Sequence, residues 1–405
     1  MAFLTALRRS VGMYVIGLTA LFVLAACNDK PTDLGTDIIP GTDSLYALSS
    51  ITVPLVDSVV LTPKQSPIFN NTYFLFGKTD DSEARLFIEL VNYPSNLPPA
   101  TDYDVVAAEL MMRPQYYIYG DTNDRTLAVE AYELQKEWDP QATWDSIWTS
   151  SGATSYYSTG TPQVCSFSKT LVDTADSLVY VPFDPVAAKR WLTKGVDSTL
   201  RKELHGFVLL PSSGSSIRQF RNLNGQNQIM AMRFIIRHKD STDNDTTYME
   251  SVVACFTNTP VPQPGELVLQ GSRVYRISMY VDLNALPRNA IVLGATARVN
   301  ADPAASKAGR GGLDELLKCE YVPPSGTALS TTTRRDDSYG YAFTNMGFIF
   351  QLILRNADRK GTILISPEGS SEFWRMNRIR LHGANADTTL RPRVTLIYTV
   401  PKVLQ

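Results

Sequence analysis

The sequence predicts an all-β protein: two tandem jelly-roll-like β-sandwich units, each with a short helix, that follow an N-terminal export signal and a flexible tether. Three observations support this prediction. Apolar runs beyond about residue 50 are short and are separated by turn residues. Several of these runs alternate apolar and polar residues with the period of two that marks a half-buried strand. The same order of features also occurs twice along the chain, which indicates an internal repeat.

The composition favours strands and turns and disfavours several functions. Aromatic residues make up 10% of the 405 residues, beside 24 Gly and 24 Pro, a balance typical of strands and turns. With 44% hydrophobic and 19% charged residues, the chain can bury real cores. The formal net charge is −2, so nucleic acid is a poor candidate partner. Three His and four Cys leave little material for metal sites or nucleophile–base pairs.

Residues 1–26 have the layout of a bacterial export signal. Two arginines precede an apolar run over 11–24, which ends in Leu24-Ala25-Ala26 directly before Cys27. This segment resembles the lipobox of bacterial lipoproteins, in which the cysteine thiol is diacylated and becomes the new N-terminus. The alternative is a membrane-spanning helix, but the run is shorter than the ~20 apolar residues that a span needs. The resemblance therefore implies lipidation at Cys27.

Residues 27–50 are expected to form a flexible tether, because they are mostly polar and contain Pro and Gly. Their opening has acidic residues, Leu34-Gly35 and Ile38-Ile39-Pro40 after the cysteine. This pattern is similar to the start of an uncharacterised lipoprotein family of Bacteroidota-type bacteria. The resemblance implies a protein of the bacterial cell envelope that is lipid-anchored at the outer membrane. Several acyl chains give the stable anchoring that one chain does not.

The first β-sandwich is expected over residues 51–260. A short helix is predicted after Asp184, which can cap it, with Pro185 in the first helical position and Gly195 at its end. Strands are predicted at the apolar runs 126–134, 206–210, 233–238 and 251–256.

A proline-rich stretch over 259–265 marks the linker, and the second β-sandwich is expected over 261–405. Residues 347–354 are apolar on nearly all sides, so their pattern leaves helix and buried strand open. A strand is predicted at 291–299 and another at 393–400. In the last strand one face carries Val394, Leu396, Tyr398 and Val400.

Three features recur in the same order in both units: Leu-Pro before an Ala-containing strand, a Gly-led apolar strand that runs shortly into Gly-Ser-Ser, and a closing strand led by Arg. They occur at Leu97, Gly206 and Arg233, and again at Leu286, Gly361 and Arg393. Together with Trp138, Ala142-Thr143-Trp144 and Trp191, they resemble the DNRLRE-type domains of bacterial surface proteins, which are jelly-roll-like β-sandwiches. The second unit lacks the Trp-x-x-x-x-Thr-Trp segment. Related domains include carbohydrate-binding modules for acidic polysaccharides, so the resemblance raises glycan binding.

Two groups of residues are candidate ligand contacts. Tyr156 and Tyr157 lie in a Ser/Thr/Gly-rich loop, where at least one ring should be exposed and could stack on a sugar. Three tryptophans of the first unit, Trp138, Trp144 and Trp191, are interpreted as core residues. Several arginines lie near the Gly-Ser-Ser turns, and two explanations account for them equally well. They could be solvated residues of strand edges, or they could contact an acidic polymer. These arginines are Arg218, Arg221, Arg375 and Arg378.

No catalytic, metal or cofactor site stands out. The histidines have no cysteine or second histidine at metal-ligand spacing, and the serine-rich stretch 212–216 lacks the Gly-x-Ser-x-Gly frame. Acid-rich turns at 121–124 and 240–245 could bind calcium, although polar hairpin loops have the same composition. Carboxylate pairs for glycoside hydrolysis meet only in space, so they stay open. Cys165 and Cys255 are either a disulfide or buried free thiols.

We therefore expect a non-catalytic, membrane-anchored envelope lipoprotein that binds or scaffolds, with glycan as the first ligand class to test. It would use no cofactor or metal. Its partners would be the membrane, through the N-terminal lipid, and a polysaccharide or other envelope proteins. Two alternatives stay open: a polysaccharide hydrolase or lyase with an unrecognised site, and a structural subunit of an outer-membrane complex.

Overall fold

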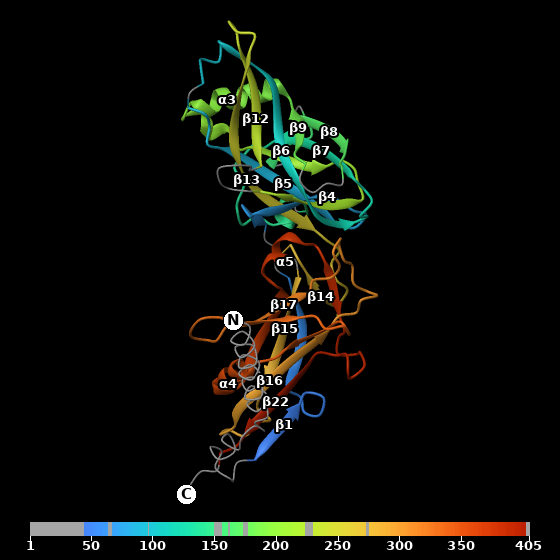
Figure 1. Ribbon diagram of the computed structural model, residues 1–405. Helices are drawn as coiled ribbons and strands as arrows, with labels where there is room; N and C mark the ends of the chain where they lie inside the picture. Colours follow the sequence, from blue (N-terminus) through green and yellow to red (C-terminus); the bar gives the residue numbers. More distant parts are fainter. Residues whose placement is uncertain are drawn as a thin grey trace, which may run out of the picture.

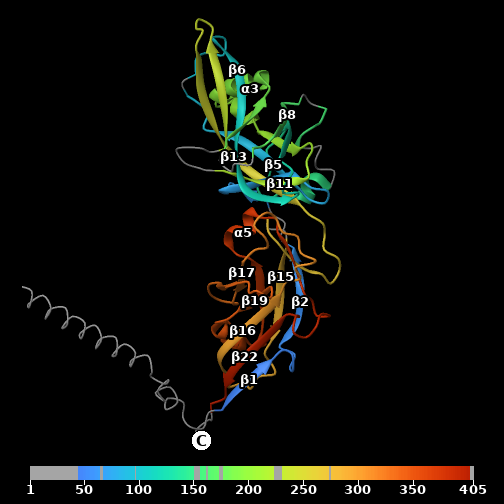
Figure 2. The same cartoon turned by 45° about the vertical axis from the view of Figure 1, so that its right-hand side comes forward.

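The computed structural model describes residues 44–63, 67–95, 97–149, 156–160, 163–172, 177–222, 230–272 and 275–401. This part of the chain is mostly β-strand, in three sheets, so the predicted all-β class is confirmed. Strands β3 to β13 form one body, the barrel unit, and strands β1, β2 and β14 to β22 form a second, the two-sheet unit (Figure 1). The two units lie end to end along the molecule (Figure 2).

The barrel unit closes on itself. Six strands pair in a ring: β13 (Asn244–Asn258), β12 (Ala231–His238), β6 (Tyr103–Gly120), β11 (Ser216–Arg221), β4 (Tyr73–Lys78) and β5 (Glu83–Val91). This closure differs from the predicted sandwich because β5 pairs with β13 along its whole length. Such a pairing joins residues far apart in the chain, and no local pattern indicates it.

Further strands extend the barrel sheet. Strand β5 also pairs with β10, which leads on to β7 and β8, while β6 pairs with β9 and β13 pairs with β3. Their bounds are β3 (Ile68–Phe69), β7 (Thr126–Glu133), β8 (Cys165–Thr170), β9 (Val179–Phe183) and β10 (Phe207–Pro211). One hydrophobic core includes residues of the ring and of these additional strands.

The helix predicted after Asp184 is confirmed as α3 (Pro185–Val196). The Asp184 carboxylate accepts hydrogen bonds from the backbone N–H groups of Val186 and Ala187, as an N-cap does. The buried face of α3 includes Trp191, which packs in the core of the barrel unit as predicted. A short 3₁₀ helix, η3 (Leu200–Glu203), connects α3 to β10.

The two-sheet unit buries one core between two sheets. The four-stranded sheet has the order β1 (Leu45–Ser49), β22 (Arg393–Thr399), β16 (Ile291–Asn300) and β19 (Gly340–Phe343). The seven-stranded sheet contains β18 (Leu329–Arg334), β17 (Leu316–Tyr321), β20 (Lys360–Pro367), β15 (Tyr275–Asp282), β14 (Leu267–Gln270), β21 (Arg378–Leu381) and β2 (Val56–Pro63). In β22, Val394 and Leu396 are buried whereas Thr395 and Ile397 are exposed, so the predicted alternation is confirmed there.

Residues 347–354, which the pattern left open between helix and strand, lie in helix α4 (Gly347–Arg355). One face of α4 is buried and carries Ile349, Phe350, Ile353 and Leu354. Phe348 is exposed. Three short helical elements of the described chain have no counterpart in the prediction: η3, the π-helical turn η2 (Asp145–Thr149) and helix α5 (Gly369–Trp374). Within the described ranges, no helix has both the length and the apolar character needed to cross a bilayer.

The first described strands belong to the second unit. Residues 45–49, expected at the end of the tether, form β1 and pair with β22. Residues 56–63, expected in the first sandwich, form β2 and pair with β15. The two-sheet unit therefore takes strands from both ends of the described chain, and the boundary expected at residue 50 separates segments that fold together.

A buried polar cluster joins the two units. Oδ1 of Asn377 accepts a hydrogen bond from the Tyr117 hydroxyl of β6 at 3.0 Å and another from the Gly309 N–H at 2.8 Å. Nδ2 of Asn377 donates to Oδ1 of Asp314 at 3.0 Å. Asn377 and Asp314 are fully buried. Burial raises the pKa of Asp314, against the opposing effect of the Arg375 charge. The units are thus joined by specific directional contacts.

Candidate binding pocket

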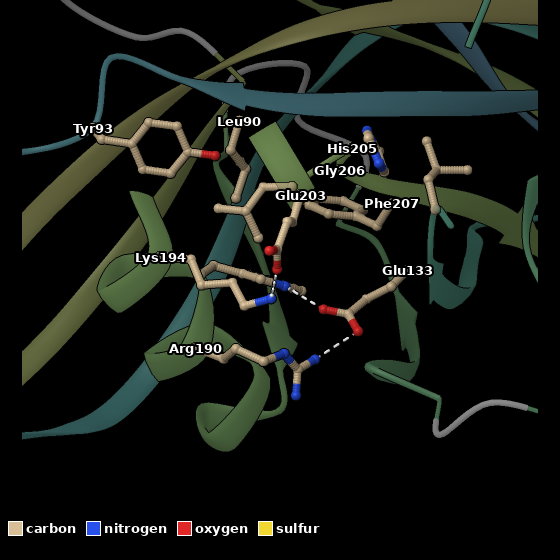
Figure 3. Close-up of a pocket in the computed structure, with 12 residues that line it drawn as sticks. Leu90, Tyr93, Glu133, Arg190, Lys194, Glu203, His205, Gly206 and Phe207 are labelled. Carbon is tan, nitrogen blue, oxygen red and sulfur yellow. Dashed lines mark hydrogen bonds and ion pairs between the residues drawn. The ribbon is translucent and has the colours of Figure 1, made fainter. Parts of the chain in front are cut away.

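One hollow in the barrel unit combines aromatic and charged side chains (Figure 3). It has a volume of about 100 Å³ and lies between α3, the end of β7 and the start of β10. We call it the α3 pocket. Its aromatic and charged lining includes Tyr93, Glu133, Arg190, Trp191, Lys194 and Glu203.

Glu133, the last residue of β7, holds two side chains of α3. Its Oε2 accepts a hydrogen bond from Nη2 of Arg190 at 2.6 Å, and its Oε1 accepts one from the indole N–H of Trp191. One turn further along α3, Lys194 donates to Oε2 of Glu203 at 2.6 Å. Each of these cations is therefore paired. Arg190 still exposes 45% of its side chain, so its guanidinium can also meet a ligand.

Burial alters the titration of two groups beside the pocket. Burial raises the pKa of Tyr93 to about 12, so its phenol keeps its proton and can donate a hydrogen bond. The Arg201 guanidinium lies 5.0 Å from the centre of the Tyr93 ring, a cation–π distance. Burial also raises the pKa of Glu89; the charge of Glu137 adds to this rise and His205 opposes it. The pocket offers the neutral phenol of Tyr93 and paired charges to a small polar group.

The sequence pattern alone does not identify the α3 pocket. Arg190 and Lys194 are four residues apart, so they share one face of a helix. That spacing is the one signal that the sequence carries. Glu133 comes from a strand before the helix and Glu203 from the turn after it, and only the fold brings both carboxylates to the same place.

The two candidate tyrosines pack in a satellite core on the barrel. Tyr157 is buried and stacks on Tyr132 with ring centres 6.1 Å apart. Its hydroxyl oxygen lies 3.2 Å from the indole nitrogen of Trp148. Tyr156 is partly buried against Phe87. The rings are therefore held by other aromatic side chains. Trp138 is also buried in this cluster, so its predicted core placement is confirmed.

Three of the four candidate arginines make side-chain contacts within the molecule. Arg218 is 5% exposed and its guanidinium donates to the backbone carbonyl of Asp124. Nη1 of Arg375 lies 3.3 Å from Oδ1 of Asp314. Nη1 of Arg378 donates to the backbone carbonyl oxygen of Pro260 at 2.7 Å. Arg221, at the end of β11, is partly buried. The structure thus places Arg375 and Arg378 near the junction between the units rather than beside the α3 pocket.

The described cysteines and acidic residues form neither the disulfide nor the calcium site that the sequence left open. Cys165, Cys255 and Cys319 are buried free thiols, so Cys165 and Cys255 do not form a disulfide. In the acid-rich turn 121–124, the Asp124 carboxylate is engaged by backbone N–H groups. Among the residues that the structure describes, no group of three or more His, Cys, Asp or Glu could hold a metal ion. Cys27 lies outside the described residues.

Comparisons with known proteins give no family. No family model and no curated protein matches the chain. Among solved structures, it is similar to the structure of infectious bursal disease virus Gx strain, at 11% identity over 86% of this chain and 78% of that chain, with a TM-score of 0.11. It is also similar to the infectious bursal disease virus VP2 subviral particle, at 11% identity over 87% and 82% of the two chains and the same TM-score. A TM-score this low carries no argument about fold or function.

Proposed function

We propose that this chain is a non-catalytic lipoprotein of the bacterial cell envelope, anchored to the outer membrane through Cys27, and that its barrel unit binds a glycan. One spatial relationship carries the proposal. Strand β1, at the end of the segment expected to be a tether, lies at the end of the molecule furthest from the barrel unit, and α3 lies towards the opposite end (Figures 1 and 2). Helix α3 lines the pocket. An anchor ahead of β1 would therefore leave the pocket facing away from the membrane.

The chemistry of the α3 pocket favours a saccharide. Sugars present hydroxyl groups to hydrogen-bonding side chains and apolar ring faces to aromatic ones. The pocket provides Tyr93 as a donor, and Arg190 as a partly exposed cation for an acidic sugar. A volume of about 100 Å³ suits one end of a chain or one substituent rather than a whole oligosaccharide. For the organisation of the chain, we infer an internal repeat, supported by the recurring order of sequence features.

Lipidation is tested by the Cys27→Ser variant. It should lose metabolic labelling by a radioactive fatty acid and leave the membrane fraction or stall before signal removal. Asn28→Ser is the matched control, since it changes the next residue and keeps the thiol. Unchanged labelling and membrane partition of Cys27→Ser would contradict the anchor.

Glycan binding is tested with an array that includes acidic polysaccharide fragments, followed by calorimetry on any hit. The double variant Arg190→Ala/Lys194→Ala should weaken binding of an acidic fragment by roughly tenfold or more, because it removes two cations. Lys202→Ala is the matched control, because Lys202 is exposed on the neighbouring η3 and does not line the pocket. Equal affinities in both variants would contradict this site.

One observation favours an enzyme as the second candidate function. A carboxyl group whose pKa is raised by burial is suited to act as a general acid, and Glu89 is such a group beside His205 and Tyr93. In that case the chain would cleave a polysaccharide rather than only bind it. Release of new reducing ends, abolished by Glu89→Gln, would establish the enzyme and overturn the non-catalytic proposal.

A further inference from the structure

Five apolar side chains are exposed on the four-stranded sheet and the adjoining start of α4. Strands β1, β22 and β16 of this sheet lie in the part of the molecule away from the barrel unit (Figure 1). The five side chains each have between 44% and 64% of their surface exposed. They are Leu45, Ile291, Leu293, Phe348 and Ile397. We call this set the distal patch. A contiguous exposed apolar patch on a folded protein marks a surface that meets a partner or a membrane.

Strand register makes the patch continuous. Thr399 in β22 pairs with Leu45 of β1 on one side and with Ile291 of β16 on the other. Ile397, two residues earlier in β22, points to the same face of the sheet. Its partners on the two neighbouring strands are an alanine and a glycine, so small side chains leave its flanks open.

The start of α4 extends the patch. The register of β16 shifts between Val292 and Gly294, and this bulge adds Leu293 to the exposed surface. The helix begins against the bulge, since a Cβ atom added to Gly347 would lie 3.3 Å from the carbonyl oxygen of Leu293. Phe348, the next residue, is the most exposed of the five.

The segments that carry the patch contain cationic but no acidic side chains. The segments that carry it, 44–50, 288–299, 345–355 and 393–401, contain four arginines and no Asp or Glu. Arg288 and Arg355 in these segments are exposed. Apolar side chains flanked by cations are the composition of surfaces that sit in the interface of an anionic membrane.

The described chain begins beside this patch. The carbonyl of Ser44, the first described residue, accepts a hydrogen bond from the Thr399 hydroxyl at 3.3 Å. Cys27 is 17 residues earlier, and the proposed tether of that length would span roughly 20–25 Å on average. An acyl group on Cys27 would hold the patch within reach of the bilayer. We propose that the distal patch docks on the lipid surface that carries the anchor, and this inference rests on the proposed lipidation.

The test places a nitroxide label in the patch of the full-length lipidated protein. Phe348→Cys is labelled and reconstituted into vesicles of phosphatidylethanolamine and phosphatidylglycerol. The described native thiols are buried, so the new cysteine takes the label. The matched control is Val186→Cys on α3, an apolar residue that is 72% exposed in the barrel unit. The label at position 348 should lose collisions with a water-soluble nickel chelate and gain collisions with oxygen, whereas the label at 186 should stay accessible to the chelate.

A label at 348 that collides with the chelate as often as the label at 186, on protein that floats with the vesicles, would overturn the docking proposal. Dipolar broadening between labels at 348 would show a second copy on the patch and would overturn it too. Adding Ile397→Glu should return the 348 label to water while the protein stays attached to the vesicles. If Cys27→Ser keeps its membrane partition in cells, the anchor proposal fails by itself, and the label still reports whether the patch meets lipid.

Discussion

The hydroxyl oxygen of Tyr117 lies 3.0 Å from Oδ1 of Asn377, and it also lies 2.8 Å from the backbone nitrogen of Met376. Burial raises the pKa of Tyr117 well above its usual range, so the phenol keeps its proton. It therefore donates to Asn377 and accepts from Met376 at the same time. One side chain of the barrel unit completes the hydrogen bonding of two consecutive residues of the two-sheet unit.

Tyr117→Phe should destabilise the protein by about 1–3 kcal/mol, because the Met376 N–H would stay buried without its acceptor. Urea unfolding followed by tryptophan fluorescence measures this change. Tyr116→Phe is the matched control, since Tyr116 is 65% exposed and its replacement should change stability by about 0.5 kcal/mol or less. Equal unfolding midpoints for the two variants would show that the junction does not depend on this hydroxyl.

Local patterns predicted the elements that local chemistry determines. Asp184 and Pro185 identified α3, and the alternation along β22 identified its buried face. Ring closure through β5 and β13, and the pairing of β1 with β22, depend on contacts between distant segments. Short-range patterns hold no information about such partners, so they predict neither the barrel closure nor the pairing of the N-terminal strands.

The candidate site illustrates the same limit. Tyr157 and Arg218 are candidate ligand contacts on the sequence alone because polar, glycine-rich segments surround them, yet both are buried. Their polar tips reach partners inside the fold: Trp148 lies beside the Tyr157 hydroxyl, and Arg218 donates to the carbonyl of Asp124. A loop-like sequence thus predicts turn chemistry but not the exposure of an aromatic or guanidinium group within it.

A buried ion pair should matter more than an exposed one. Arg276 of β15 pairs with Glu372 of α5, and their side chains are only 15% and 8% exposed. Glu372→Gln should cost about 3–5 kcal/mol, because it leaves the guanidinium buried without a counter-charge. The matched control is Glu315→Gln, whose partner Arg334 lies 3.4 Å away in a pair that is 65–73% exposed, and it should cost about 1 kcal/mol or less. Chemical denaturation of both variants gives the comparison; similar losses would refute the argument from burial.

The carboxylate of Asp124 should make stability depend on acid pH. Burial alone would raise its pKa, but hydrogen bonds from the Ser215 and Thr126 backbone N–H groups outweigh burial and lower the pKa to about 2. An unfolded carboxyl titrates near ~3.9. The stabilisation is therefore complete above pH ~4 and is lost as the pH falls towards ~2.

Asp124→Asn should lower the melting temperature at neutral pH, and the difference from the native protein should shrink as the pH falls through this window. Thermal unfolding at a series of pH values measures it. A difference that stays constant from neutral pH down to pH ~2 would mean that the ionised carboxylate is not what holds the turn.

The three buried thiols should be unreactive in the folded protein. Burial raises the pKa of Cys165, Cys255 and Cys319 to about 12, and only the thiolate is nucleophilic. A thiol reagent at neutral pH should modify none of them until denaturant is added, and then all three should react. Mass spectrometry of non-reduced peptides should find no Cys165–Cys255 link. Rapid modification without denaturant would place a thiol at the surface.

Two glycines with nearly the same backbone φ angle distinguish the cost of backbone strain from the cost of a steric clash. Gly206 has φ +86° and Gly265 has φ +85°. A Cβ atom at Gly206 would lie 1.9 Å from the carbonyl oxygen of Ile88, whereas at Gly265 nothing lies within 4 Å. Gly265→Ala should therefore cost only the strain of a left-handed residue, about 1–2 kcal/mol. Gly206→Ala should cost more, because β10 and β5 must separate.

Urea unfolding of both variants checks the order of the two costs. Gly206 also lines the α3 pocket, so Gly206→Ala should bind a glycan ligand more weakly, whereas Gly265→Ala should bind it normally. Equal unfolding costs would mean that the close approach to Ile88 relaxes freely.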